Sequence, residues 1–171
     1  GKKSKASVPT RARLPKVVRR LKPSANALRN TIEGYGSRYV VPPQSVLDDL
    51  AKEAAHTSPG QKLKEARAAS RKMAREGRAA TCDYVHGERA EAAAAFVLDA
   101  FNGKIESILD TVKDDNVGTI IQKVKDAWQL VNAQGQAFRN ARITPEYLEA
   151  RLEEARWAAL VQKIKLDQRE E

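Results

Sequence analysis

Apolar residues recur at three- and four-residue spacing through most of the chain after residue 44, and alanine is the commonest of them. Hydrophobic residues make up 42% of the 171 residues, whereas aromatic residues make up only 5%. Alanine, leucine, glutamate, lysine, arginine and glutamine are strong helix formers, and β-branched runs bounded by tight hairpin turns are almost absent. The sequence therefore predicts an all-α fold, a compact multi-helix domain with a long C-terminal helix.

Helix start and stop signals divide this region into segments. The expected helices start at Ser45, Ser58, Arg78, Asn116 and Thr144. Ser58 as the cap, Pro59 at the first position and Gln61 closing a capping box indicate a helix that ends near Glu76. The helical stretch that starts at Arg78 is expected to run to Val112, and interruptions near Gly87 and Gly103 stay open. The helix that starts at Asn116 is expected to end at Gly135. Thr144 with Pro145 predicts a last helix over about residues 145–169.

The spacing also predicts which faces are buried. The expected core positions are Leu47, Leu50, Ala51 and Ala54; Val97, Phe101, Ile105, Ile108 and Val112; Ile120, Val124, Ala127, Trp128 and Val131; and Leu148, Leu152, Ala155 and Ala159. The last helix carries a second stripe at Trp157, Val161 and Ile164, which is too wide for a two-stranded seam. Its first turns are therefore expected to pack on the body, and its polar end from Asp167 could continue into a coiled coil.

Positive charge is concentrated at the start of the chain. Residues 1–40 hold eleven of the 31 basic residues and one of the 22 acidic ones, which leaves the rest of the chain at −1. We divide the chain into a basic, flexible arm or linker over residues 1–23, with short helices expected after Pro15 and Ser24, and a helical domain over 24–171. Such an arm attracts polyanions such as DNA or anionic lipid, with Arg19 and Arg20 as candidate contacts, or it is a solvated linker.

A row of basic side chains on the helix after Ser58 is a second candidate DNA-contact surface. Its members are Lys64, Arg67, Arg71, Arg75 and Arg78. Steps of three and four residues place all five within roughly 80° of one another on a helix. A phosphate backbone would relieve their mutual repulsion. The alternative is that these arginines pair with acids on neighbouring helices, such as Asp48, Asp49 or Glu91.

Catalytic and metal-binding chemistry finds little support. Cys82 and His86 would stand one helical turn apart as a nucleophile and its base, but no oxyanion-donor set accompanies them. Zinc ligands would have to come from Cys82, His56 and His86, which lack paired spacing. We therefore assign no catalytic residue, metal or cofactor. The single cysteine excludes an intrachain disulfide and fits a reducing, cytoplasmic location, and no apolar run is long enough to span a bilayer.

Five short blocks together carry a family resemblance. They read Leu-Arg-Asn at 28–30, Gly-Tyr-Gly at 34–36, Arg-Ala-Ala-Thr-Cys-Asp-Tyr-Val at 78–85, Asp-Ala-Phe-Asn-Gly-Lys at 99–104, and Phe-Arg-Asn-Ala-Arg-Ile-Thr-Pro-Glu-Tyr-Leu at 138–148. Over about residues 25–171 the chain resembles the SNIPE-associated domain, a bacterial module linked with defence against phage DNA. In that family the module commonly precedes a GIY-YIG nuclease domain and follows a membrane-anchoring or coiled-coil segment.

The resemblance implies a non-catalytic accessory module that positions or regulates a nuclease domain of the same polypeptide. It also implies a parent GIY-YIG endonuclease, anchored at the inner membrane in some members, and it transfers no catalytic residue onto this chain. The first residue is Gly1 rather than methionine, so we expect a piece of a longer protein. DNA is the expected partner. The alternative is a protein-interaction module that self-associates through its C-terminal helix or senses a phage or host protein.

Overall fold

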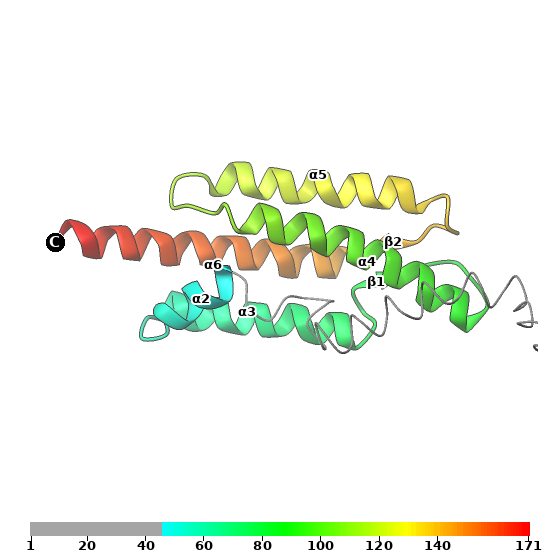
Figure 1. Cartoon of the computed structure of the whole chain (residues 1–171), viewed down its shortest axis with the longest axis horizontal. Coiled ribbons are helices and arrows are strands. Elements are labelled where there is room, and N and C mark those ends of the chain that lie inside the picture. Colours follow the sequence, from blue (N-terminus) through cyan, green and yellow to red (C-terminus); the bar gives the residue numbers. More distant parts are fainter. Residues whose placement is uncertain (1–45) are drawn as a thin grey trace, which may run out of the picture. The chain divides into compact units, whose positions relative to one another are not determined.

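Five helices and one short strand pair form residues 46–171, the part of the chain that the computed structural model describes (Figure 1). The elements are α2 (Val46–Glu53), α3 (Ser58–Arg75), β1 (Ala80–Thr81), α4 (Gly87–Leu109), α5 (Val117–Gly135), β2 (Arg142–Ile143) and α6 (Pro145–Glu170). These bounds confirm the all-α fold class and the long final helix. The predictions for the arm, for the helices after Pro15 and Ser24, and for Arg19 and Arg20 lie outside the described residues.

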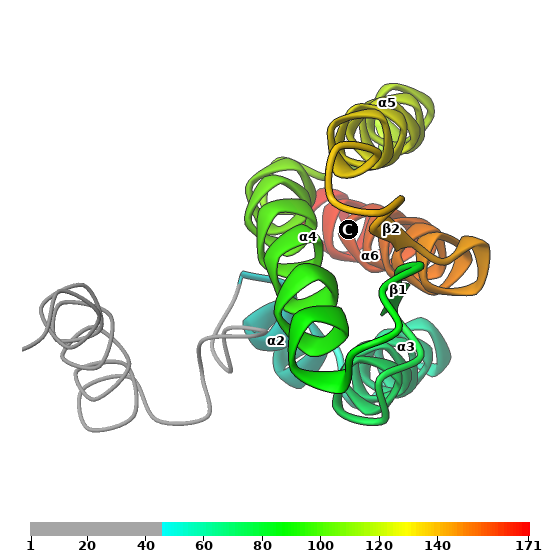
Figure 2. The same cartoon turned by 90° about the vertical axis from the view of Figure 1, so that its right-hand side faces the viewer.

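Helix α6 is the element around which the others pack. It contacts α3, α5 and α2, while α4 lies along α5 and α2 lies along α3. Figure 2 looks down this arrangement, with α6 between α5 and α3 and with α4 beside it. No helix within residues 46–171 is both long and apolar enough to span a membrane.

The predicted core faces are the ones that the structure buries. Leu47, Leu50, Ala51 and Ala54 are buried, and so are the predicted positions of α4 and α5 except the half-buried Ile108 and Trp128. In α6, Leu152, Ala155, Ala159 and Val161 are buried, whereas Leu148, Trp157 and Ile164 are half-buried. Helical periodicity alone therefore located most of the apolar core.

The caps of α3 and α6 show how closely local signals fix a helix start. At α6 the prediction is confirmed, because Thr144 caps the helix and its Oγ1 accepts a hydrogen bond from the Tyr147 amide at 3.3 Å. At α3 the cap is Thr57, not Ser58: Oγ1 of Thr57 accepts from the Gly60 amide at 3.2 Å. Gln61 then donates to the Ala55 carbonyl instead of closing a capping box, so that prediction was one residue off.

Residues 78–86 are not helical, contrary to expectation. Gly77 adopts a left-handed conformation (φ 70°) just after α3. The chain then forms β1, which pairs antiparallel with β2 so that Ala80 lies opposite Ile143. Hydrogen bonds to this distant strand pair the backbone N–H and C=O groups that a helix would have paired with near neighbours in the sequence. Gly103, the other break left open, lies inside an uninterrupted α4.

Candidate functional site

The predicted row of basic residues is divided between the interior and the surface. Arg67 is only 1% exposed and forms ion pairs with Asp48 of α2, Glu106 of α4 and Glu154 of α6. The distances to these three acids are 3.2, 3.0 and 2.7 Å. Arg67 therefore joins four helices, and it does not face solvent where a polyanion would bind.

Two more arginines complete this cluster, which we term the ion network (Asp48, Arg67, Arg71, Glu106, Arg151 and Glu154). Arg71 lies 2.5 Å from Asp48, so both arginines use the alternative that the sequence left open, pairing with an acid of a neighbouring helix. Arg151 is fully buried and pairs with Glu154 at 2.9 Å and with Glu106. The ion network therefore contains three arginines and three carboxylates. Charged side chains can be buried in a core when each is paired with a group of opposite charge.

The pKa shifts in the ion network follow from these pairings. Burial by itself raises the pKa of Glu106, but Arg151 and Arg67 outweigh it and hold the pKa below its usual value. Asp48 shows the same balance, with burial opposed by its hydrogen bonds to Arg67 and Arg71, and its pKa is also lowered. Burial lowers the pKa of Arg67, yet Glu154, Asp48 and Glu106 raise it further still. Asp48, Glu106 and Arg67 are therefore charged at neutral pH.

Lys64 and Arg75 are the members of the predicted row that remain exposed on α3, and we term them the α3 cation pair. They lie eleven residues apart, which places them on one face about 16 Å apart along the helix axis. Arg78 is also exposed, but it follows the end of α3 and forms an ion pair with Glu76 at 2.6 Å. The structure thus does not present the five residues as a single basic surface.

The sequence left open that Arg67 pairs with Asp48, but it did not predict that Arg67 and Arg151 are buried, because an arginine at helical spacing is usually exposed. A signal was available in the composition of α3, whose 18 residues include Leu63 and Met73 as the only large apolar side chains. A helix packed on both α2 and α6 has to bury more than that, and the buried positions between them are Arg67 and Ser70. The shortage of large apolar side chains on α3 is therefore the signal that one of its charged residues lies on the buried face.

Cys82 does not stand in a catalytic arrangement with His86, because residues 82–86 form a loop and not a helical turn. The thiol of Cys82 donates to the Ala90 carbonyl at 3.5 Å, and His86 is the residue that precedes α4. Within the described part of the chain, no group of three or more His, Cys, Asp or Glu side chains is placed to hold a metal ion.

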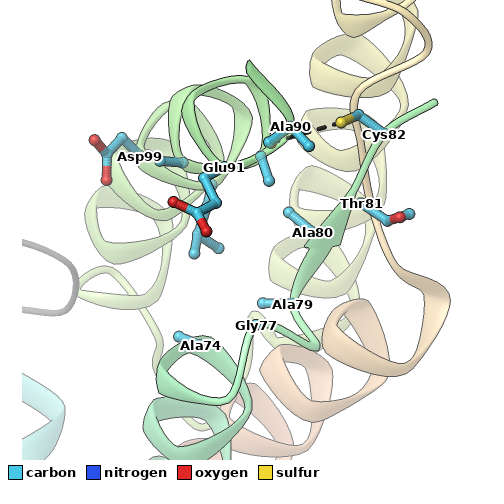
Figure 3. Close-up of a pocket in the computed structure, with 12 residues that line it drawn as sticks. Ala74, Gly77, Ala79, Ala80, Thr81, Cys82, Ala90, Glu91 and Asp99 are labelled. Carbon is cyan, nitrogen blue, oxygen red and sulfur yellow. Dashed lines mark hydrogen bonds between the residues drawn. The ribbon is translucent and has the colours of Figure 1, made fainter. Parts of the chain in front are cut away.

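Cys82 instead lines a pocket that the sequence did not reveal (Figure 3). The pocket has a volume of about 440 Å³ and lies between the end of α3, β1 and the first half of α4. Six of its twelve lining residues are alanine, and Glu91 extends its carboxylate from α4 into the space between α4 and β1. Asp99 stands at the far edge, and burial raises the pKa of its carboxyl. The pocket suits a small apolar group that carries a cation beside it.

An exposed pair of aromatic rings lies elsewhere, where α4 meets the turn after α5. Phe96 is 62% exposed and Phe138 is 44% exposed, and their ring centroids are 5.5 Å apart with an interplanar angle of 60°. Phe138 is followed by two consecutive left-handed residues, Arg139 (φ 50°) and Asn140 (φ 54°). We term Phe96 and Phe138 the aromatic pair.

Comparison with protein families identifies the domain. A family model described as the SNIPE associated domain matches residues 55–166. The chain belongs to this family. No curated protein and no solved structure matches it. The SNIPE-associated domain is an accessory domain and not itself catalytic.

Three of the five sequence blocks that resemble this family meet in the fold. The block at 78–85 supplies β1 and the block at 138–148 supplies β2, so the two pair directly. The block at 99–104 joins them through Asn102, whose Oδ1 accepts a hydrogen bond from the Tyr147 hydroxyl at 2.8 Å. The rings of Phe101 and Tyr147 also lie in contact, with centroids 6.1 Å apart. The blocks at 28–30 and 34–36 lie outside the described residues.

Proposed function

We propose that this SNIPE-associated domain is the accessory module of a bacterial anti-phage nuclease, which contacts DNA and positions a GIY-YIG nuclease domain joined beyond α6. Helix α6 carries this proposal. The buried Arg151 and Glu154 tie its first half to the core, and Lys165 near its end forms an ion pair with Glu53 of α2. Its last turn, from Asp167, is exposed and polar. A long helix that packs against α3, α5 and α2 and ends in a polar segment is suited to orient whatever follows it.

DNA contact is the second part of the proposal. It is supported by the positive charge of residues 1–40 and by the α3 cation pair, which remains exposed after Arg67 and Arg71 have paired internally. Cations of this kind bind the phosphate backbone by a sequence-independent attraction that weakens steeply with salt. Arg71 is unsuited to a charge-reversal test, because its replacement would also disturb Asp48.

Fluorescence anisotropy with a labelled DNA duplex tests the DNA contact. The affinity is measured at salt concentrations from about 50 to about 300 mM, because its salt dependence reports the counterions that are released when phosphates are bound. We expect Lys64→Glu with Arg75→Glu to weaken binding several-fold and to flatten the salt dependence. Lys125→Glu with Lys163→Glu is the matched control, since both lysines are exposed on other helices. Equal losses in the two double variants, or no binding by the wild type at low salt, would contradict a role for α3.

A protein-interaction function is the second candidate, and it is favoured by apolar side chains on the surface of α6. Leu160 and Leu166 are 45% and 41% exposed there. Self-association through this helix would cover them. Light scattering should then give a mass above that of one chain, and Leu160→Glu should return the protein to a monomer. A wild-type monomer at high concentration would exclude self-association.

A further inference from the structure

The aromatic pair is held in place at a strained turn. Non-glycine residues with φ near 50° are uncommon, and each costs on the order of 1 kcal/mol. Here Arg139 and Asn140 both adopt this conformation directly after Phe138. Asp83 stabilises the turn, because its amide donates to the Arg139 carbonyl at 2.8 Å and its carboxylate accepts from Asn140 at 3.3 Å. The turn therefore fixes Phe138 against Phe96 while both rings stay exposed.

Two exposed arginines stand close in sequence to the members of the aromatic pair. Arg139 follows Phe138 and is exposed. Arg89 is exposed in the first turns of α4, seven residues before Phe96, and residues seven apart fall on the same face of a helix. Arg142 lies next to this region too, but it is tied to Asp83 at 3.1 Å. Exposed aromatic rings with arginines on the same elements are the residue types that bind an unpaired nucleobase and its phosphate.

We propose that the aromatic pair is a stacking platform for single-stranded DNA. Unpaired bases stack on Phe96 and Phe138, and Arg139 and Arg89 bind the flanking phosphates. A duplex cannot use the platform, because its bases are already stacked on one another. This inference rests on the proposed DNA contact, but it names a different surface from the α3 cation pair and a different substrate.

Fluorescence anisotropy of the full chain tests the platform. It compares the affinity for a labelled oligothymidine of about fifteen nucleotides with the affinity for a duplex of equal length. Phe96→Ala with Phe138→Ala should weaken binding of the single strand about tenfold, since stacking contributes that much or more per base. It should leave duplex binding unchanged. The salt dependence for the single strand should keep its slope, because no charge is removed, whereas Arg139→Gln should lower that slope by about one.

Leu130→Ala is the matched control, because this leucine is 57% exposed on α5 and adds apolar surface without a ring. Phe96→Leu with Phe138→Leu keeps the apolar bulk but removes the ring faces, so it should weaken the single strand as well, even if the alanine variant fails to fold. Unchanged oligothymidine binding in the leucine variant overturns the platform. Equal loss on the duplex, or a change in mass by light scattering instead of in DNA affinity, also overturns it.

The two proposals fail separately. If the α3 variants weaken duplex binding while the phenylalanine variants bind oligothymidine like wild type, the proposed function stands and the platform is lost. If the phenylalanine variants weaken oligothymidine binding while the α3 variants change nothing, the platform stands and the DNA contact moves from α3 to the end where β1 and β2 pair.

Discussion

Nη1 of Arg67 lies 2.7 Å from Oε2 of Glu154, and this contact joins the middle of α3 to the first half of α6 inside the core. Both side chains are almost completely buried. Buried ion pairs are weak evidence for extra stability, because desolvation offsets much of their attraction. They do discriminate between packings, since a helix that shifts or rotates leaves a charge unpaired. We therefore regard the ion network as the device that sets the register of α2, α3, α4 and α6.

Arg67→Met should destabilise the protein by about 3–5 kcal/mol, because it leaves carboxylates of the ion network in the core with one cation fewer. Urea unfolding followed by tryptophan fluorescence measures the change in the free energy of unfolding. Lys64→Met, on the exposed face of the same helix, is the control and should change that free energy by less than about 0.5 kcal/mol. A midpoint for Arg67→Met equal to that of the control would show that the ion network does not hold the helices.

The stability of the domain should fall in acid. The pKa values of Asp48 and Glu106 are lowered in the folded protein from ordinary values of 3.8 and 4.5. A lowered pKa means that the folded state binds fewer protons, so the stabilisation is complete above these ordinary values and is lost as the pH falls through the lower, folded-state values. We expect the unfolding midpoint to be flat near neutrality and to drop below about pH 4.

Glu106→Gln isolates part of this effect. The variant should be less stable than wild type at pH 7, because Arg67 and Arg151 lose a carboxylate partner. Its stability should also depend less on pH below the ordinary Glu106 pKa of 4.5, because one of the titrating groups is gone. Glu149→Gln is the control, because Glu149 is exposed on α6. Its free energy of unfolding should follow that of the wild type at pH 7 and in acid. Parallel pH curves for Glu106→Gln and wild type would refute the linkage.

Local signals in the sequence were enough to find the helices and most of the apolar core. Thr144 and Pro145 fixed the start of α6, and the spacing from Val97 to Ile105 fixed the buried face of α4. These features depend on residues within one or two turns of each other, so a linear pattern contains them. The start of α3 was predicted one residue too late, because Thr57 and Ser58 are adjacent hydroxyl residues and either could cap the helix. The structure has Thr57 as the cap.

The features that the sequence did not reveal all depend on distant partners. Ala80 pairs with Ile143, and nothing near Ala80 encodes that contact. Arg67 is buried because Asp48, Glu106 and Glu154 converge on it from three other helices. Phe96 and Phe138 become an exposed pair only when α4 and the turn after α5 come together. Periodicity predicts which side of a helix is buried, but not which charges the fold will bring inside.

Two glycines should respond in opposite directions to the same substitution. Gly103 lies inside α4 with open space around the position of an added Cβ, so Gly103→Ala should stabilise the protein by about 0.5–1 kcal/mol. At Gly135 the added Cβ would lie 1.8 Å from the Ala141 carbonyl oxygen, so Gly135→Ala should destabilise it by about 1–3 kcal/mol. Thermal unfolding by circular dichroism compares the two, and shifts of the same sign would contradict this packing at the end of α5.

Tyr147→Phe should test the junction of the family's sequence blocks. The variant keeps the ring that packs on Phe101 but removes the hydroxyl that donates to Oδ1 of Asn102 at 2.8 Å. Both residues are buried, so we expect a loss of about 1–2 kcal/mol in the free energy of unfolding, measured with urea. Tyr84→Phe, on the loop before α4, is the control and should stay near wild type. A double-mutant cycle combines Tyr147→Phe with Asn102→Ala. The losses in the free energy of unfolding of the two single variants should not add in the double variant, because both remove the same hydrogen bond. Additive losses would mean that the contact between α4 and α6 contributes through ring packing alone.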